Sequence, residues 1–371
     1  MQNSTKRNPV FDIAKGIGII LVVLGHACFK YSTFIYMFHM PLFLIISGYF
    51  FKVETVIEKK DLMVFCKRRI RLLYLPYVLT SMVFLFCTNL FIKLNFYMAK
   101  TVETPILERG YDYVAQLSLS VVFDKLWKIL VMYSREPIAG PTWFLKVLFF
   151  VVIFSAIGHY INKKIFKTEK GFEIARFFTY FICFLIGYFL SLAKFNFYQI
   201  GTIFTSSFFF YIGICYRKFN NKIKMSYPSF FVSFLILWLA YIYQYPYRTE
   251  LYINQYYNPL IITITSITGF IFVLSISEVL NKKIVISNIF SYIGANTLTI
   301  LCLHVMFFKF VTALHVYLYN EPISILYTHA IGHTTAQGWW IIYTLVGISG
   351  PIALHYVYLL IKKNITKVRG V

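Results

Sequence analysis

Long apolar stretches separated by short polar segments run through the whole sequence. Ten of these stretches are long enough, or nearly long enough, to cross the roughly 30 Å of a membrane's hydrocarbon as α-helices. They lie at about 11–29, 35–51, 72–92, 142–161, 174–193, 201–216, 230–245, 258–278, 292–312 and 339–361. Because backbone polar groups inside a membrane need internal partners, the pattern predicts an all-α fold, a polytopic transmembrane helical bundle of about ten spans.

One further stretch, 113–133, is apolar enough to resemble a span. It contains Asp124, Lys125 and Lys128, and these charges favour an amphipathic helix at the membrane interface over a crossing. A true crossing would invert the topology of everything that follows. We find no repeat and no low-complexity linker, so the expectation is a single membrane domain over residues 1–371.

Composition agrees with the pattern, since 59% of the residues are hydrophobic and only 13% are charged. A soluble core of this length needs far less apolar material. If the N-terminus is cytoplasmic, about two thirds of the 36 Lys and Arg residues fall in inner segments, which predicts that both termini are cytoplasmic. The net charge of +22 then reflects topology and contact with membrane lipids, and we expect no nucleic-acid partner because no recognition element accompanies it.

Charged and titratable residues inside the first span are the main candidates for chemistry. Lys15 and His26 are eleven positions apart, which is roughly 16 Å along a helix and close to three whole turns, so both project from nearly the same face. Such residues are costly within a membrane. Lys15 either snorkels to the inner headgroups or faces an anionic cofactor, and His26 either is a buried structural histidine or acts as a general base.

Further candidates lie at the ends of neighbouring spans. Arg68 and Arg71 are three positions apart at the inner start of the third span, where they either anchor the helix or bind phosphate groups. His39 lies one turn into the second span and is expected to line the site rather than to act as a second base. Glu136 either orients His26 or is a solvated loop acid. We expect no metal, because the sequence has no cluster with metal-ligand spacing.

Several motifs, taken in order, resemble the acyltransferase family 3 membrane proteins, particularly the polysaccharide O-acetyltransferase and fucose 4-O-acetylase-like branch. The resemblance rests on the opening FDIAKG and VVLGH, then FHMPLF with SGYFF, the RxxR of Arg68 and Arg71, PTWFL around Trp143, and IGANTL containing Asn296 and followed by His304. Together these motifs run from end to end of the chain. The family's Arg-x10-His pair falls on Lys15 and His26, where Lys keeps the positive charge but lacks the bidentate fork of Arg.

The resemblance implies a membrane O-acyltransferase of the bacterial inner membrane and cell envelope. It would move an acetyl or other short acyl group from cytoplasmic acetyl-CoA to a hydroxyl of an extracytoplasmic or lipid-linked glycan. His26 would be the general base, and Lys15, Arg68 and Arg71 would bind the cofactor. Trp143, Asn296 and His304 would line the site as donors to a developing oxyanion.

The family resemblance leads to one expected absence, and the sequence leaves several alternatives open. Many members carry a C-terminal soluble hydrolase-like domain, which we expect to be absent here. The sequence leaves a homo-oligomer open. Two alternatives also stay open: a transporter or flippase for an acyl group or lipid-linked sugar, although no internal halves are visible, and an acyltransferase acting on a lipid or small molecule.

Overall fold

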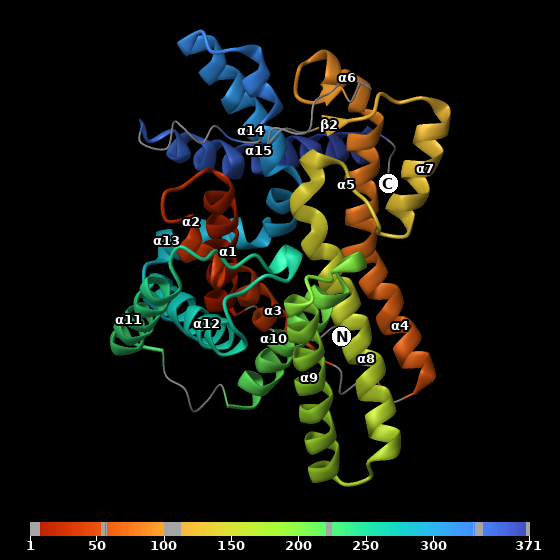
Figure 1. The fold of residues 1–371 in the computed structure, drawn as a ribbon, viewed down its shortest axis with the longest axis vertical. Coiled ribbons are helices and arrows are strands. Elements are labelled where there is room, and N and C mark those ends of the chain that lie inside the picture. Colours follow the sequence, from red (N-terminus) through yellow and green to blue (C-terminus); the bar gives the residue numbers. More distant parts are fainter. Residues whose placement is uncertain are drawn as a thin grey trace. The chain divides into compact units, whose positions relative to one another are not determined.

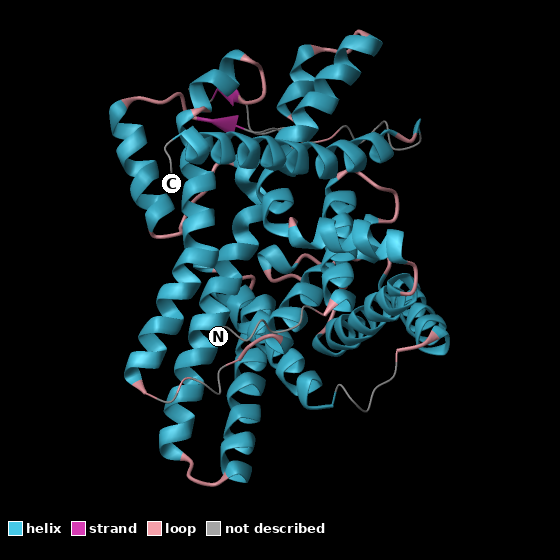
Figure 2. Cartoon of the chain, turned by 180° about the vertical axis from the view of Figure 1, so that it is seen from behind, coloured by secondary structure: helices cyan, strands magenta, loops and turns pink. Residues whose placement is uncertain are grey.

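The structure is a computed structural model that describes residues 8–52, 56, 58–99, 113–219, 225–328, 330 and 337–368. Helices make up nearly all of its regular structure, and Figure 2 shows the two short strands beside them. These strands, β1 (Met98–Ala99) and β2 (Tyr113–Val114), pair in parallel with Met98 opposite Tyr113. The predicted all-α class is confirmed, and this two-residue ladder is a minor addition to it.

The elements are labelled in Figure 1, which colours the chain from its N-terminal to its C-terminal end. The α-helices are α1 (Pro9–His26), α2 (Ser32–Tyr36), α3 (His39–Tyr49), α4 (Lys59–Arg69), α5 (Leu75–Phe86), α6 (Thr88–Lys93), α7 (Leu119–Leu130), α8 (Trp143–Ile165), α9 (Glu169–Leu192), α10 (Ile200–Phe219), α11 (Tyr227–Gln244), α12 (Pro259–Asn281), α13 (Ile284–Ala295), α14 (Thr297–Tyr319) and α15 (Trp339–Val368). The π-helical turn η1 (Ile70–Tyr74) joins α4 to α5. The short 3₁₀ helices are η2 (Pro137–Thr142), η3 (Phe197–Gln199), η5 (Leu251–Ile253) and η6 (Ile323–Tyr327).

Ten helices or joined helical runs in the described part of the chain are long and apolar enough to cross a membrane, so the predicted polytopic bundle is confirmed. Two predicted boundaries were wrong. The third run is Lys59–Phe86 rather than 72–92, because the helix continues through a basic segment that hydropathy excludes. The ninth is Thr297–Tyr319 rather than 292–312, because Asn296 separates α14 from the short apolar α13. The cytoplasmic location of both termini stays a prediction.

The charged segment 113–133 forms no membrane-spanning helix in its described residues. Its helix, α7, has 12 residues and therefore a length of about 18 Å, well short of the hydrocarbon thickness. Leu119, Phe123 and Trp127 recur every four positions along α7 and are exposed by 81%, 71% and 66%. An exposed apolar stripe on a short helix supports the predicted interfacial location.

Two compact units make up the chain. The first contains Met1–Ala14, Thr33–Tyr77 and Trp143–Ser287, and the second contains Lys15–Ser32, Val78–Thr142 and Asn288–Val371. Several helices, α1 among them, contribute residues to both. The prediction of one membrane domain over residues 1–371 is not tested by this division and stays a prediction.

Helix α10 is at the centre of the first unit. It packs against α3, α8 and α9, while α12 packs against α3 and α11. Gly48 of α3 and Gly213 of α10 let the two helices approach closely, since an added Cβ at either position would meet the backbone of the partner helix. Figure 1 shows α4, α8 and α9 as neighbouring long helices, and α8 contacts both of the others. Small residues thus allow the tight helix packing on which membrane bundles depend.

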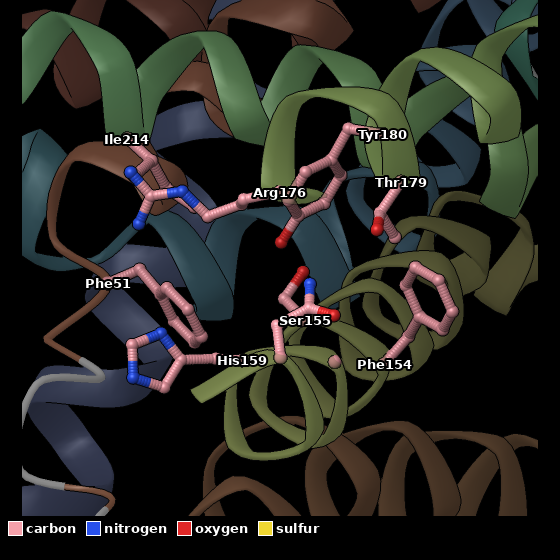
Figure 3. A pocket seen from close by; sticks show the side chains of 10 residues that line it. Phe51, Phe154, Ser155, His159, Arg176, Thr179, Tyr180 and Ile214 are labelled. Atoms are coloured by element: carbon pink, nitrogen blue, oxygen red, sulfur yellow. The ribbon is translucent and has the colours of Figure 1, made fainter. Parts of the chain in front are cut away.

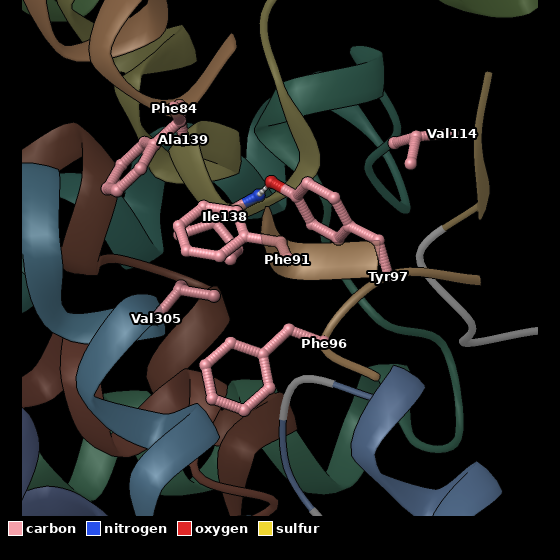
Figure 4. Packing of buried hydrophobic residues seen from close by; sticks show 8 residues of the cluster. All are labelled: Phe84, Phe91, Phe96, Tyr97, Val114, Ile138, Ala139 and Val305. Atoms are coloured by element: carbon pink, nitrogen blue, oxygen red, sulfur yellow. Dashed lines mark hydrogen bonds between the residues drawn. The ribbon is translucent and has the colours of Figure 1, made fainter. Parts of the chain in front are cut away.

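Helix α14 is at the centre of the second unit, where it packs against α15 and η2. Buried aromatic and aliphatic side chains from α5, α6, η2 and α14 form the cluster drawn in Figure 4, which consists of Phe84, Phe91, Phe96, Tyr97, Val114, Ile138, Ala139 and Val305. The hydroxyl oxygen of Tyr97 accepts a hydrogen bond of 3.3 Å from the Ile138 N–H. In α1, Gly16 approaches the backbone of α13 at Phe290 and Gly294.

Candidate active site

A single helix, α1, carries both Lys15 and His26. The apolar sequence between them keeps the helix continuous, so the roughly 16 Å separation expected from helix rise applies. His26 is the last residue of α1, and the chain then turns through Cys28, whose φ is 56°. Lys15 and His26 are both half-buried. The predicted arrangement of these two residues on one helix is confirmed.

His304 of α14 lies beside His26 in the second unit. The centroids of the two rings are 5.4 Å apart, with an angle of 41° between the ring planes. His304 is completely buried, and its Nδ1 lies 2.8 Å from the carbonyl oxygen of Ile300, one turn earlier in the helix. A carbonyl oxygen can only accept, so Nδ1 carries a proton and donates it, and in the neutral ring Nε2 holds the lone pair. The helix backbone therefore fixes His304 in a tautomer whose Nε2 can accept a proton.

Glu136 also belongs to the second unit, and the interpretation of it as a solvated loop acid was wrong. Its side chain is buried, with 2% of the residue exposed. Oε1 lies 2.9 Å from Lys125 Nζ, and Oε2 accepts a hydrogen bond of 3.4 Å from the Thr88 hydroxyl. The carboxylate thus connects α6 and α7 to the segment before η2, and both of its oxygens have partners other than His26.

Asn296 lies at the break between α13 and α14. Its Nδ2 donates a hydrogen bond of 2.9 Å to the Tyr292 carbonyl oxygen, which caps the end of α13. Two positions earlier, Gly294 packs against Gly16 of α1, the neighbour of Lys15. Asn296 therefore lies closer to the Lys15 end of α1 than to His26, and this geometry does not favour the predicted oxyanion role beside His26.

In the first unit, His39 begins α3 and is buried, with 3% exposed. Its Nδ1 donates a hydrogen bond of 2.9 Å to the Ile35 carbonyl oxygen, so Nε2 again holds the lone pair. Its ring lies 4.8 Å from that of Tyr36, and the guanidinium of Arg248 lies 3.8 Å above the same Tyr36 ring. Sequence reasoning missed Arg248. The signal was an arginine inside a tyrosine-rich loop, the setting of a cation–π contact.

Trp143 is the first residue of α8 and is buried against Phe144 and Tyr252, with ring centroids 5.9 and 5.6 Å away. One turn later, Lys146 is 2% exposed, and its Nζ lies 3.6 Å from the centroid of the Tyr198 ring. Sequence reasoning missed this lysine as well, although a cation inside an apolar stretch was the signal. This end of the first unit therefore contains a buried aromatic group and a buried positive charge.

Arg68 and Arg71 are exposed at the junction of α4 with the π-helical turn η1. Such turns widen the helix and often mark functional positions. Arg69, which lies between them, has its guanidinium 4.6 Å from the centroid of the Phe65 ring. Two exposed guanidinium groups are suitable for binding the phosphates of a soluble cofactor, as predicted, and that role remains a proposal.

Sequence reasoning also missed Lys309, which is completely buried in α14. Its Nζ donates hydrogen bonds of 2.9, 3.0 and 2.9 Å to the carbonyl oxygens of Phe96, Leu326 and Thr328. An ammonium group donates and cannot accept, so it suits a set of carbonyl oxygens. Lys309 therefore ties two loops to α14 and has a structural role.

Among the described residues, no group of three or more His, Cys, Asp or Glu side chains could hold a metal ion.

In the described part of the chain, ten helices long and apolar enough to cross a membrane define an integral, multi-pass membrane protein, and its second unit carries two adjacent histidine rings. The acyltransferase domain of family 3 matches residues 8–357. The chain therefore belongs to this family. The narrower fucose 4-O-acetylase-like branch stays a prediction.

The chain is also similar to nodulation protein NolL of Sinorhizobium fredii (strain NBRC 101917 / NGR234), with 48% identity over 59 residues. This match covers 12% of the present chain and 16% of the length of that protein, so it extends over less than a fifth of either. No solved structure matches the chain.

Proposed function

We propose that the protein transfers an acetyl or other short acyl group from acetyl-CoA to a hydroxyl of an extracytoplasmic or lipid-linked glycan in the bacterial inner membrane. The observation that carries the proposal is the His26–His304 pair, because ring centroids 5.4 Å apart place two proton-accepting groups together in a membrane acyltransferase. Acyl transfer to a hydroxyl needs such a base, since an alcohol attacks poorly until its proton is removed.

His26 is the base in this proposal. It is half-buried at the end of α1, so an acceptor hydroxyl can reach its ring, whereas His304 is fully buried. The Nε2 lone pair of His304 supports His26 by accepting a proton or a hydrogen bond from it. The hydroxyl oxygen forms a bond to the acyl carbon, the carbon–sulfur bond breaks, and the proton held by the histidines passes to the departing thiolate.

Lys15, Arg68 and Arg71 are the proposed contacts for the donor. Acetyl-CoA carries the thioester and several phosphate oxygens, and the positive charges of these three side chains suit the phosphates. Lys15 lies about 16 Å along α1 from His26, a distance that an extended pantetheine arm can cover. His39 and Trp143, both in the first unit, are proposed as contacts for the acceptor, since an indole ring can stack on a sugar.

The test uses purified protein in proteoliposomes, given acetyl-CoA carrying an isotopic label and a lipid-linked glycan acceptor. The proposal predicts labelled O-acetyl glycan and free CoA in equal amounts with the wild type, and neither product with His26→Ala. Glycan acylation in cells, followed by proton NMR, gives the same comparison without a chosen acceptor. CoA release without a modified glycan would instead favour a lipid or small-molecule acceptor, and the absence of CoA release would favour a transporter.

A further inference from the structure

A small cavity lies in the first unit, where α8 ends and α9 begins. Residues from α8, α9 and α10 line it, together with Phe51 just beyond α3. Figure 3 shows the side chains of His159 from α8 and Arg176 from α9 with the Phe51 ring around the cavity, and the Tyr180 hydroxyl pointing toward that of Ser155. None of the residues assigned above to acyl transfer lines this cavity.

The polar groups of the cavity are hydrogen-bond donors or groups that can act as donors. The polar lining residues are Ser155, His159, Asn162, Arg176, Thr179 and Tyr180. No carboxylate is among the lining residues. This combination of a guanidinium, an imidazole, an amide and hydroxyl groups is suited to an oxyanion rather than to a cation.

Arg176 is the charged residue that matters most in the cavity. Only 8% of it is exposed. Its Nη2 lies 2.5 Å from Glu173 Oε2, but its Nε is buried and makes no hydrogen bond with any described residue. A buried donor of a charged group that lacks a partner destabilises a fold, so such a donor points to a ligand.

The nearby charges leave the cavity positive. Glu173 is shared, since Lys218 Nζ lies 2.7 Å from the same Oε2 that Arg176 contacts. One carboxylate therefore serves two cations. Arg217 of α10 donates a hydrogen bond of 2.8 Å to the carbonyl oxygen of Phe51, which places a further cation beside the lining.

We propose that this cavity binds a phosphate group through Arg176 and His159. A guanidinium matches two phosphate oxygens at once, and imidazole supplies a further donor. The cavity is much smaller than the sites that hold whole small molecules, so it suits one charged group rather than a whole nucleotide. The phosphate comes either from the ribose 3′-phosphate of coenzyme A, in which case the inference rests on the proposed function, or from a phospholipid headgroup.

The experiment compares binding of CoA and of 3′-dephospho-CoA to the purified full-length protein in nanodiscs by isothermal titration calorimetry. If the cavity holds the 3′-phosphate, Arg176→Gln weakens CoA binding about ten- to a hundredfold and leaves dephospho-CoA binding unchanged. Lys164→Gln is the matched control, since it removes an exposed charge from the same end of α8 outside the cavity. If the cavity holds a headgroup, native mass spectrometry finds a phospholipid on the wild type that Arg176→Gln loses, and CoA binding does not change.

A second variant leaves every charge in place. Gly158 lines the cavity, and an added Cβ there meets no atom within 4 Å, so Gly158→Leu fills the space without removing Arg176. It is expected to reproduce the loss seen with Arg176→Gln. The proposal is overturned if folded samples of both variants bind CoA as tightly as the wild type and retain the same phospholipid. Because the readout is binding, this result is independent of whether acyl transfer to a glycan occurs.

Discussion

The rings of His26 and His304 lie 5.4 Å apart, although one residue ends the first helix of the chain and the other belongs to α14. Contacts from α15 and from the α14 backbone fix the region around the pair. Gly347 of α15 packs against Val23 and Phe308, close in sequence to the two histidines. The hydrogen bond from His304 to the Ile300 carbonyl oxygen sets the tautomer of the buried ring. We propose that the two histidines act together in holding and passing a proton.

Removing either histidine should therefore cost most of the acyl-transfer rate. We expect His26→Ala and His304→Ala each to lower kcat by about 10²- to 10⁴-fold, the usual contribution of general acid–base catalysis. The double variant should be little worse than the poorer single variant, because residues acting as a unit are not additive. The measurement is CoA release in proteoliposomes. His355→Ala on α15 is the control, and additive losses in the double variant would refute the pairing.

Separate substitutions at His304 should distinguish folding from chemistry. In His304→Asn, the amide nitrogen can take the place of Nδ1 and donate to the Ile300 carbonyl oxygen, but no group replaces Nε2. We expect this variant to keep the thermal stability of the wild type while losing acyl transfer. His304→Leu should lose both. If His304→Asn retained full activity, the lone pair on Nε2 would have no role in proton transfer.

Much of the fold could be predicted from the sequence, because membrane-spanning helices appear as long apolar runs. Ten apolar runs predicted the ten spans, and the spacing of Lys15 and His26 predicted their positions on one helix. The predicted helix boundaries were wrong where hydropathy does not mark them. The basic part of the third run is helical without being apolar, and a single Asn separates α13 from α14.

The contacts between distant segments were harder to predict. His304 was identified through family resemblance, but its contact with His26 depends on how α1 and α14 pack. Glu136 was misjudged because a loop position suggests exposure, whereas Lys125 and Thr88 bury it. Lys309 was missed because its partners are backbone carbonyl oxygens, which any residue can supply and no motif records.

The substitution of Lys for the family's Arg at position 15 gives a further test. Lys15→Ala is expected to raise the KM for acetyl-CoA about tenfold, since a charged hydrogen bond is lost. Lys15→Arg should keep or lower this KM, because a guanidinium can grip two phosphate oxygens. Steady-state kinetics at varied acetyl-CoA measures both, with Lys30→Ala, an exposed lysine beyond the end of α1, as the control. An unchanged KM in Lys15→Ala would indicate that Lys15 contacts a lipid headgroup rather than acetyl-CoA.

The close approach of α3 and α10 should be intolerant of any side chain at Gly213. An added Cβ there would overlap the backbone of α3 at Ile45 and Tyr49, so Gly213→Ala must push the two helices apart. We expect the variant to be destabilised and poorly recovered from membranes. Gly140→Ala is the matched control, because an added Cβ at Gly140 meets nothing within 4 Å. Fluorescence-detected size-exclusion chromatography after heating compares the two variants. Equal stability would show that α3 and α10 pack less tightly than their close approach at Gly213 indicates.

Lys309 should be more important for stability than for chemistry. Replacing it with Met, which has a similar length, leaves the carbonyl oxygens of Phe96, Leu326 and Thr328 without their donor in a buried position. We expect a loss of about 1–3 kcal/mol, the usual cost when a buried polar group loses its hydrogen-bond partner. Thermal unfolding in nanodiscs measures it, with the exposed Lys283→Met as the control. The protein that remains folded should keep its KM for acetyl-CoA and its kcat, because Lys309 donates to the backbone oxygens of Phe96, Leu326 and Thr328 rather than to a residue assigned to acyl transfer. A folded Lys309→Met protein without activity would instead place this ammonium in the proton path.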